Sequence, residues 1–148
     1  MCKKLTIGRK DKADFPELDL LNIDVKVDTG AYTSSIHCHD ITEYEKDGEK
    51  YVKFDLLDPS HPEYNEKEFK TKNYYIKSIK SSSGESEERF IIKTIIKLFN
   101  CDFETEFSLT DRSYMKTPVL LGRKLLANKF IVDVSKTNLS FKRKTKAL

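Results

Sequence analysis

The stretch Val27-Asp28-Thr29-Gly30-Ala31 decides the fold prediction, because it sets one acidic residue between an apolar strand and a tight turn. Apolar residues stand at every second position before Asp28, which predicts a strand that ends at this residue. Thr29 is small and carries a hydroxyl group, and Gly30 allows the backbone to turn tightly and to approach a neighbouring chain. The pattern indicates a carboxylate at the exposed end of a buried strand.

Asp28 has two interpretations at this point. The tripeptide Asp-Thr-Gly is typical of an ordinary turn in which the aspartate caps the backbone. It is also the pattern of a catalytic carboxylate, which needs a second carboxylate within a few ångströms so that the two share a proton. One group then acts as general base on a water and the other as general acid. The chain has one such tripeptide, so the second carboxylate would be Asp28 of a second copy.

A second motif follows late in the chain, where the apolar residues 118–121 precede Gly122 and a predicted short helix over residues 123–128. A glycine at this point allows two backbone segments to approach closely. We expect such a close contact at Gly122. The alternative is a buried strand that ends in a helix, with Gly122 as a hinge.

Hydrophobic residues recur with period two along much of the chain, which predicts strands at residues 52–56 and 103–109. The segment 91–99 is rich in β-branched residues, which predicts a third strand there. Asp47-Gly48 stands between two such segments and predicts a hairpin turn. The fold class is therefore all-β, a closed or nearly closed barrel with one short α-helix after the second motif. No linker divides the chain, so we expect a single domain over residues 1–148.

A run of small residues at 81–86 lies between two extended segments, before the strand at 91–99. Ser83 and Gly84 at its centre suit the tip of a flap that closes over a bound substrate and excludes water. A plain surface loop has the same composition. We expect Ser83 and Gly84, together with Ala31, to contact substrate.

Charge and composition limit the classes of partner and compartment. The chain has 27 basic and 24 acidic residues, a balance that does not favour nucleic acid as a partner. Its 3 cysteines show no paired spacing, which suits a reducing compartment. No signal peptide and no apolar stretch of membrane-spanning length is visible. We expect a cytoplasmic protein without a membrane partner, whose lysine-rich end (residues 142–146) is a solvated tail.

His37 and His39 form the one candidate metal site, since residues two apart on a strand share a face. A third ligand would be needed, and Asp40, His61 and Cys101 are candidates. An exposed strand face with two histidines is the more ordinary interpretation. No metal site is therefore assigned. Cys38 and Cys101 lack a nucleophile signature, so we expect buried thiols.

Two other groups near the second motif have open roles. Arg112 and Arg123 could bind acidic groups of a substrate or could brace the loop of Asp28. Asp133, in an apolar segment, could be a second carboxylate within one chain, but a structural ion pair with an arginine is the favoured interpretation.

The motifs together carry a resemblance. The chain resembles the retropepsin-like family labelled ATP-dependent zinc proteases, which is related to retroviral aspartic proteases. The similar segments run in order over nearly the whole chain, at residues 7–10, 15–18, 26–34, 108–112, 115–123 and 130–133. The resemblance implies a six-stranded acid-protease barrel and a homodimer. It also implies an aspartic endopeptidase in which Asp28, Thr29 and Gly30 form the catalytic loop. The motif that contains Gly122 would then pack behind this loop.

Members of that family often occur with a glutamate ligase, which implies a peptide substrate that is rich in glutamate. The label itself fits the sequence poorly. No Gly-rich phosphate loop and no His-Glu-x-x-His motif is present, so no cofactor is expected. Two alternatives stay open: a non-catalytic peptide-binding module on the same fold, and a zinc-dependent peptidase that uses His37 and His39.

Overall fold

The computed structural model describes residues 4–57, 68–80, 83–111 and 117–146, and strands dominate these ranges. Its elements in chain order are β1 (Leu5–Ile7), β2 (Lys10–Phe15), the short 3-10 helix η1 (Pro16–Leu18), β3 (Leu20–Val27), β4 (Ser34–Lys46), β5 (Glu49–Leu56), β6 (Glu68–Thr71), β7 (Tyr74–Lys80), β8 (Ser86–Leu98), β9 (Cys101–Thr110), β10 (Val119–Leu121), α1 (Arg123–Leu126), β11 (Phe130–Val132) and α2 (Leu139–Lys146).

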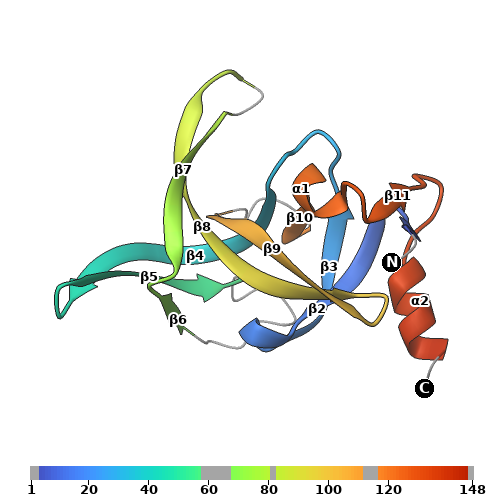
Figure 1. Cartoon of the computed structure of the whole chain (residues 1–148), viewed down its shortest axis with the longest axis horizontal. Helices are drawn as coiled ribbons and strands as arrows, with labels where there is room; N and C mark the ends of the chain where they lie inside the picture. Colours follow the sequence, from blue (N-terminus) through green and yellow to red (C-terminus); the bar gives the residue numbers. More distant parts are fainter. Residues whose placement is uncertain (1–3, 58–67, 81–82, 112–116, 147–148) are drawn as a thin grey trace.

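Six strands close into a barrel, which confirms the predicted fold class. Their order is β10, β3, β2, β8, β9 and β4, and β4 pairs with β10 to complete the circle. Closure gives each of these strands a partner on both sides, so the barrel itself has no free edge. β5 and β6 extend the sheet outward from β4, while β1 and β11 form a separate two-stranded sheet (Figure 1).

The core follows the predicted alternation. Val52, Phe54 and Leu56 of β5 are buried, as the period-two pattern requires. Inside the barrel the rings of Phe15 and Phe107 meet edge to face with 5.5 Å between centroids. Burial of one such side chain contributes about 1.5–3 kcal/mol relative to exposure, so the apolar face of each strand fixes its register.

Two hairpins project from the barrel (Figure 1). β4 and β5 meet at Asp47 and Gly48, whose φ angles of 53° and 78° are those of the predicted tight turn. β7 and β8 form the other hairpin, which pairs from Tyr74 to Lys80. Ser83 and Gly84 lie in the connection at its far end, so the predicted flap segment is part of a hairpin.

The prediction of the first helix was right, but the helix at the chain end was not predicted. α1 begins at Arg123 as expected and ends at Leu126, two residues earlier than predicted. Residues 142–146, expected as a solvated tail, belong to α2. The buried Asp11 carboxylate of β2 accepts hydrogen bonds from the backbone N–H groups of Ser140 and Phe141 and so caps this helix. Neither helix in the described ranges is long and apolar enough to cross a membrane.

Candidate active site

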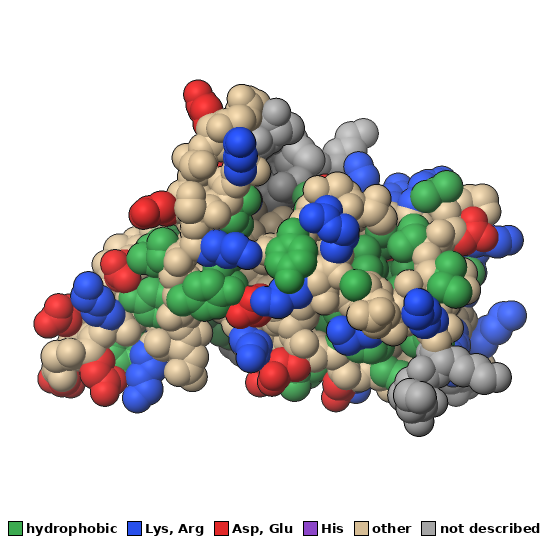
Figure 2. Space-filling model, turned by 45° about the horizontal axis from the view of Figure 1, so that its top comes forward, with side chains coloured by type: hydrophobic (Ala, Val, Ile, Leu, Met, Phe, Trp, Pro, Cys, Tyr) green, Lys and Arg blue, Asp and Glu red, His purple; other side chains and the backbone are tan. Residues whose placement is uncertain are grey.

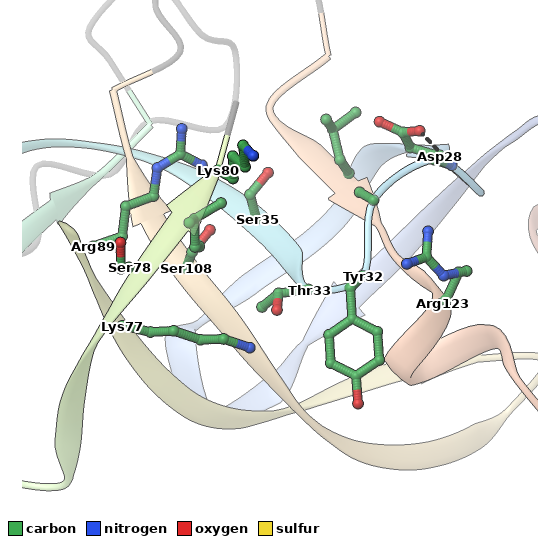
Figure 3. Close-up of a pocket in the computed structure, with 14 residues that line it drawn as sticks. Asp28, Tyr32, Thr33, Ser35, Lys77, Ser78, Lys80, Arg89, Ser108 and Arg123 are labelled. Carbon is green, nitrogen blue, oxygen red and sulfur yellow. Dashed lines mark hydrogen bonds between the residues drawn. The ribbon is translucent and has the colours of Figure 1, made fainter. Parts of the chain in front are cut away.

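Asp28 lies at the end of β3, where three strands meet. Its backbone N–H donates to the carbonyl of Leu121 in β10 at 2.9 Å. β10 runs parallel to β3 and antiparallel to β4, so it lies between the two strands that the Asp28 loop connects. This arrangement anchors the loop to the end of β10. The Asp28 side chain is half-exposed (Figure 3).

The loop is a tight turn that the aspartate itself stabilises. The Gly30 N–H donates to Oδ1 of Asp28 at 3.0 Å, and the Ala31 N–H donates to the Asp28 carbonyl at 3.1 Å. The capped-turn interpretation is therefore correct for the backbone. It leaves Oδ2 of the same carboxylate available for chemistry, so capping does not exclude the catalytic interpretation. Thr29 and Gly30 are exposed in the single chain.

Gly122 packs behind this loop as predicted. A Cβ atom at Gly122 would lie 2.7 Å from the carbonyl oxygen of Tyr32 and 2.9 Å from the carbonyl carbon of Thr33. Its N–H donates to Oγ of the buried Ser34 at 3.0 Å. The next two N–H groups, at the start of α1, donate to the carbonyls of Ala31 and Tyr32 at 2.8 and 2.9 Å. The second motif thus fixes the back of the Asp28 loop through backbone contacts.

Arg123 braces the loop from the side. Its Nη1 donates to the Thr29 carbonyl at 2.9 Å, and its guanidinium lies 5.8 Å from the ring centre of Tyr32. Lys77 of the β7–β8 hairpin approaches the same ring to 5.1 Å. Tyr32 therefore contacts a cation from α1 and a cation from the hairpin. Of the two roles left open for Arg123, the structure shows a contact that braces the loop, through the Thr29 carbonyl.

A pocket of about 710 Å³ opens beside the loop, and both Asp28 and Arg123 line it. Its other charged lining residues among those described are Lys77, Lys80 and Arg89, all from the β7–β8 hairpin. Lys and Arg side chains gather at the foot of this hairpin (Figure 2). One carboxylate therefore faces four cations, and this balance favours an acidic ligand.

Comparison with known sequences shows the family of this chain. A family model described as "RimB-like: Retropepsin-like aspartic endopeptidase RimB" matches residues 6–143. The chain belongs to the RimB-like family. A probable alpha-L-glutamate ligase of Shewanella pealeana is 38% identical over 138 residues, which cover 90% of this chain and 29% of that protein. A second protein of that name, from Desulfotalea psychrophila, is 37% identical over 134 residues, which cover 88% of this chain and 28% of that protein.

This chain spans less than a third of the length of the curated relatives it matches. A crystal structure of a protein of unknown function from Legionella pneumophila has the same fold. It superposes with a TM-score of 0.72 at 26% identity and covers 93% of this chain and 99% of that one. The retropepsin-like fold predicted from the sequence is therefore confirmed.

Some of the site residues predicted from the sequence line the pocket of this RimB-like structure, and others do not. Asp28, Gly30 and Ala31 line the pocket, whereas Thr29 lies on the exposed side of the loop. Ser83 and Gly84 lie in the exposed connection of the hairpin and are outside the described lining, so their substrate contact stays a prediction.

Residues from the flanks of the hairpin and the barrel line the pocket without having been predicted. Ser108 of β9 is one of them, because the pattern of that strand suggested that its serine faced solvent. It is 1% exposed, since the second half of β9 lies between β8 and β4. Strand pairing alone brings together the further polar lining residues from the strands, which are Ser35, Lys77, Ser78, Lys80 and Arg89.

The two histidines of β4 belong to different groups. His37 Nδ1 lies 3.8 Å from a carboxylate oxygen of Asp111. His39 Nε2 lies 3.8 Å from Asp40 and 3.6 Å from Asp55, its cross-strand partner. These last three residues could hold a divalent metal ion through one nitrogen and two oxygens. None of them lines the described pocket, so such a metal would be separate from Asp28.

The remaining candidates are placed away from the pocket or outside the described residues. The Asp133 carboxylate accepts hydrogen bonds from the N–H and hydroxyl of Ser135, and these bonds hold its pKa below the ordinary value. The expected arginine partner is not found among the described residues. Cys38 is buried as expected, and burial raises the pKa of its thiol. Cys101 is exposed, contrary to expectation. Arg112 and His61 are outside the described residues.

Proposed function

We propose that this protein is an aspartic endopeptidase that works as a homodimer, with Asp28 of one chain facing Asp28 of the other. The observation that supports this most strongly is the half-exposed Asp28 carboxylate, held at the rim of a 710 Å³ pocket by β3, β10 and β4. It is the one carboxylate among the described lining residues. A proton-sharing pair therefore needs a second chain. Thr29 and Gly30, exposed beside it, would form the contact between the two loops.

In the proposed dimer, two like charges within a few ångströms cannot both ionise readily, so the pair holds one proton. The ionised Asp28 takes a proton from a water molecule, whose oxygen attacks the carbonyl carbon of the peptide bond. The protonated Asp28 of the other chain gives its proton to the carbonyl oxygen. The first Asp28 then gives the proton it took from water to the nitrogen, and the other Asp28 takes back a proton from a hydroxyl of the tetrahedral intermediate. The carbon–nitrogen bond breaks, which yields a carboxylic acid and an amine and restores the shared proton.

We further propose that the substrate is an acidic peptide, rich in glutamate. Lys77, Lys80, Arg89 and Arg123 surround the pocket, so an acidic chain gains favourable electrostatic energy on entry. The similarity to proteins named as glutamate ligases also supports a substrate that contains glutamate. A neutral peptide would gain no such energy, and a basic peptide would be repelled.

The β7–β8 hairpin would act as the flap of this enzyme. It contributes Lys77 and Lys80 to the wall of the pocket, and its connection contains Gly84 with a φ angle of 88°, a conformation that favours glycine. In the proposed mechanism the hairpin closes over bound peptide, and Ser83 and Gly84 contact its backbone. Closure would exclude bulk water from the carboxylate pair.

Cleavage of a glutamate-rich peptide and of its glutamine counterpart, followed by mass spectrometry, tests the proposal. The parent protein is compared with Asp28→Asn and with Asp24→Asn as a matched control. Asp24 is on the same strand, is exposed and pairs with Lys12 at 2.7 Å, away from the pocket. We expect cleavage by the parent and by Asp24→Asn, none by Asp28→Asn, and no effect of a metal chelator.

Other outcomes separate the alternatives. Loss of cleavage with chelator, restored by zinc, would favour a zinc peptidase and would direct attention to His39. Binding of the acidic peptide by all three proteins without cleavage would favour a binding module. A protein that stays monomeric at high concentration with peptide present, yet cleaves it, would contradict the paired mechanism.

A further inference from the structure

Two buried polar atoms in the described part of the chain lack a hydrogen-bond partner there: Oγ of Ser35 and Nε of Arg89. Buried polar groups in folded proteins are nearly always paired, so each exception needs an explanation. Both residues line the pocket that contains Asp28. Ser35 is only 5% exposed, so its hydroxyl is buried in the wall of the pocket.

Strand pairing explains why these groups face the same space. Ser35 of β4 pairs with Ser108 of β9, which pairs with Ile91 of β8. Paired residues share a face of the sheet, and so do residues two apart on one strand, which places Arg89 on the face of Ile91. Figure 3 shows Arg89, Ser35 and Ser108 grouped on one side of the pocket, with Asp28 on the other.

The missing partner must be an acceptor that suits a guanidinium and a hydroxyl. Arg89 donates through Nη2 to Glu87 at 3.3 Å, and its Nε–H remains without an acceptor in the described structure. A carboxylate fits the planar edge formed by Nε and Nη2, because its two oxygens match the spacing of the two donors. Ser35 can donate a further hydrogen bond, and Lys80 adds positive charge at the same wall.

We infer that Arg89 and Ser35 form a subsite for one carboxylate of the substrate, separate from the Asp28 pair. This inference rests on the proposed peptidase function and specifies which residues select its substrate. The carboxylate can come from a glutamate or aspartate side chain, or from the C-terminus of the peptide. In both cases an uncharged amide in its place leaves the buried Arg89 Nε–H without a charged acceptor, and Glu87 is then the one carboxylate that contacts the guanidinium in the described structure.

The test compares kcat/KM for three peptides of equal length: glutamate-rich with a free C-terminus, glutamate-rich with an amidated C-terminus, and glutamine-rich with an amidated C-terminus. Enzymes are the parent, Arg89→Gln, Ser35→Ala and the control Lys93→Gln. Lys93 is an exposed cation of the same strand, outside the described lining of the pocket. Thermal unfolding of each variant confirms that it folds.

For Arg89→Gln we expect kcat/KM for the glutamate peptide to fall at least about tenfold, with little change for the glutamine peptide. Ser35→Ala should weaken cleavage of the same peptide by a smaller factor without lowering the unfolding temperature, because the lost hydroxyl has no partner in the described fold. Lys93→Gln should match the parent. A loss for Arg89→Gln that is confined to the peptide with a free C-terminus assigns the subsite to the terminal carboxylate. A loss with both glutamate peptides assigns it to a side chain.

An equal effect of Arg89→Gln on glutamate and glutamine peptides would overturn the inference, as would a lower unfolding temperature for Ser35→Ala with unchanged preference. If no peptide is cleaved by any enzyme, the proposed function fails. The subsite is then tested separately, by measuring how tightly each variant binds the glutamate peptide. Weaker binding of the glutamate peptide to Arg89→Gln than to Lys93→Gln would then support it, and equal binding would refute it.

Discussion

Gly122 offers a direct test of how the second motif fixes the Asp28 loop. A Cβ atom added by Gly122→Ala would lie 2.7 Å from the Tyr32 carbonyl oxygen and 2.9 Å from two carbonyl carbons, those of Tyr32 and Thr33. All three atoms belong to the backbone, so no side-chain rotation can relieve the clash. The start of α1 and the loop that follows Asp28 must therefore move apart.

The energetic cost has two parts. Overpacking at a tightly packed position costs about 1–3 kcal/mol. Separation of the two segments also weakens three hydrogen bonds. The Gly122 N–H donates to Oγ of Ser34 at the start of β4 at 3.0 Å, and the N–H groups of Arg123 and Lys124 donate to the loop at 2.8 and 2.9 Å. Each contributes about 1 kcal/mol, and a partial loss is enough to relieve the contact. We expect Gly122→Ala to lower the free energy of unfolding by about 3 kcal/mol.

Urea denaturation at one fixed protein concentration measures this difference. Gly48→Ala is the matched control, because Gly48 has a φ of 78° but no atom within 4 Å of an added Cβ. We expect it to cost about 1 kcal/mol from backbone strain alone. A loss for Gly122→Ala no larger than that of Gly48→Ala would refute the close-approach explanation.

Two further predictions concern stability. Asp11→Ala removes the carboxylate that accepts the Ser140 and Phe141 N–H groups at 2.9 and 3.1 Å, so we expect a loss of about 2 kcal/mol in urea denaturation and reduced helix signal in circular dichroism; an unchanged spectrum would contradict this role. Burial raises the pKa of Glu106, but hydrogen bonds from Lys124 and Tyr75 outweigh it and the net pKa is lowered. Its stabilising effect is therefore complete above the ordinary glutamate pKa of about 4.3 and is lost as the pH falls through the lower folded value. Unfolding temperatures measured from pH 6 to pH 2 should fall less steeply for Glu106→Gln, and an identical slope would refute the prediction.

The sequence alone predicted the parts of the fold that depend on local patterns. Asp28 ends its strand because alternating apolar residues precede it and Gly30 permits the turn. Gly122 lies against the backbone of Tyr32 and Thr33, and a glycine in the sequence indicates such a close approach because it has no Cβ atom. Asp47 and Gly48 form the predicted hairpin turn, since both adopt positive φ angles at little cost.

Features that depend on contacts between residues far apart in the sequence could not be predicted from local patterns. α2 is capped by Asp11, which precedes it by more than a hundred residues, so its own sequence resembles a solvated tail. Arg89 reaches the pocket because β8 pairs with β9, and it belongs to no motif of the sequence. Asp55 approaches His39 through cross-strand pairing, a register that composition does not specify.

The central claim is that two Asp28 carboxylates form one active site, and subunit mixing tests it most directly. Parent and Asp28→Asn chains are mixed in equal amounts, allowed to exchange, and assayed for cleavage of the acidic peptide at constant total protein. If both aspartates are required, only pairs of two parent chains are active, and the rate should be about one quarter of that of the parent alone. A rate of about one half would show that each chain acts alone and would contradict the claim.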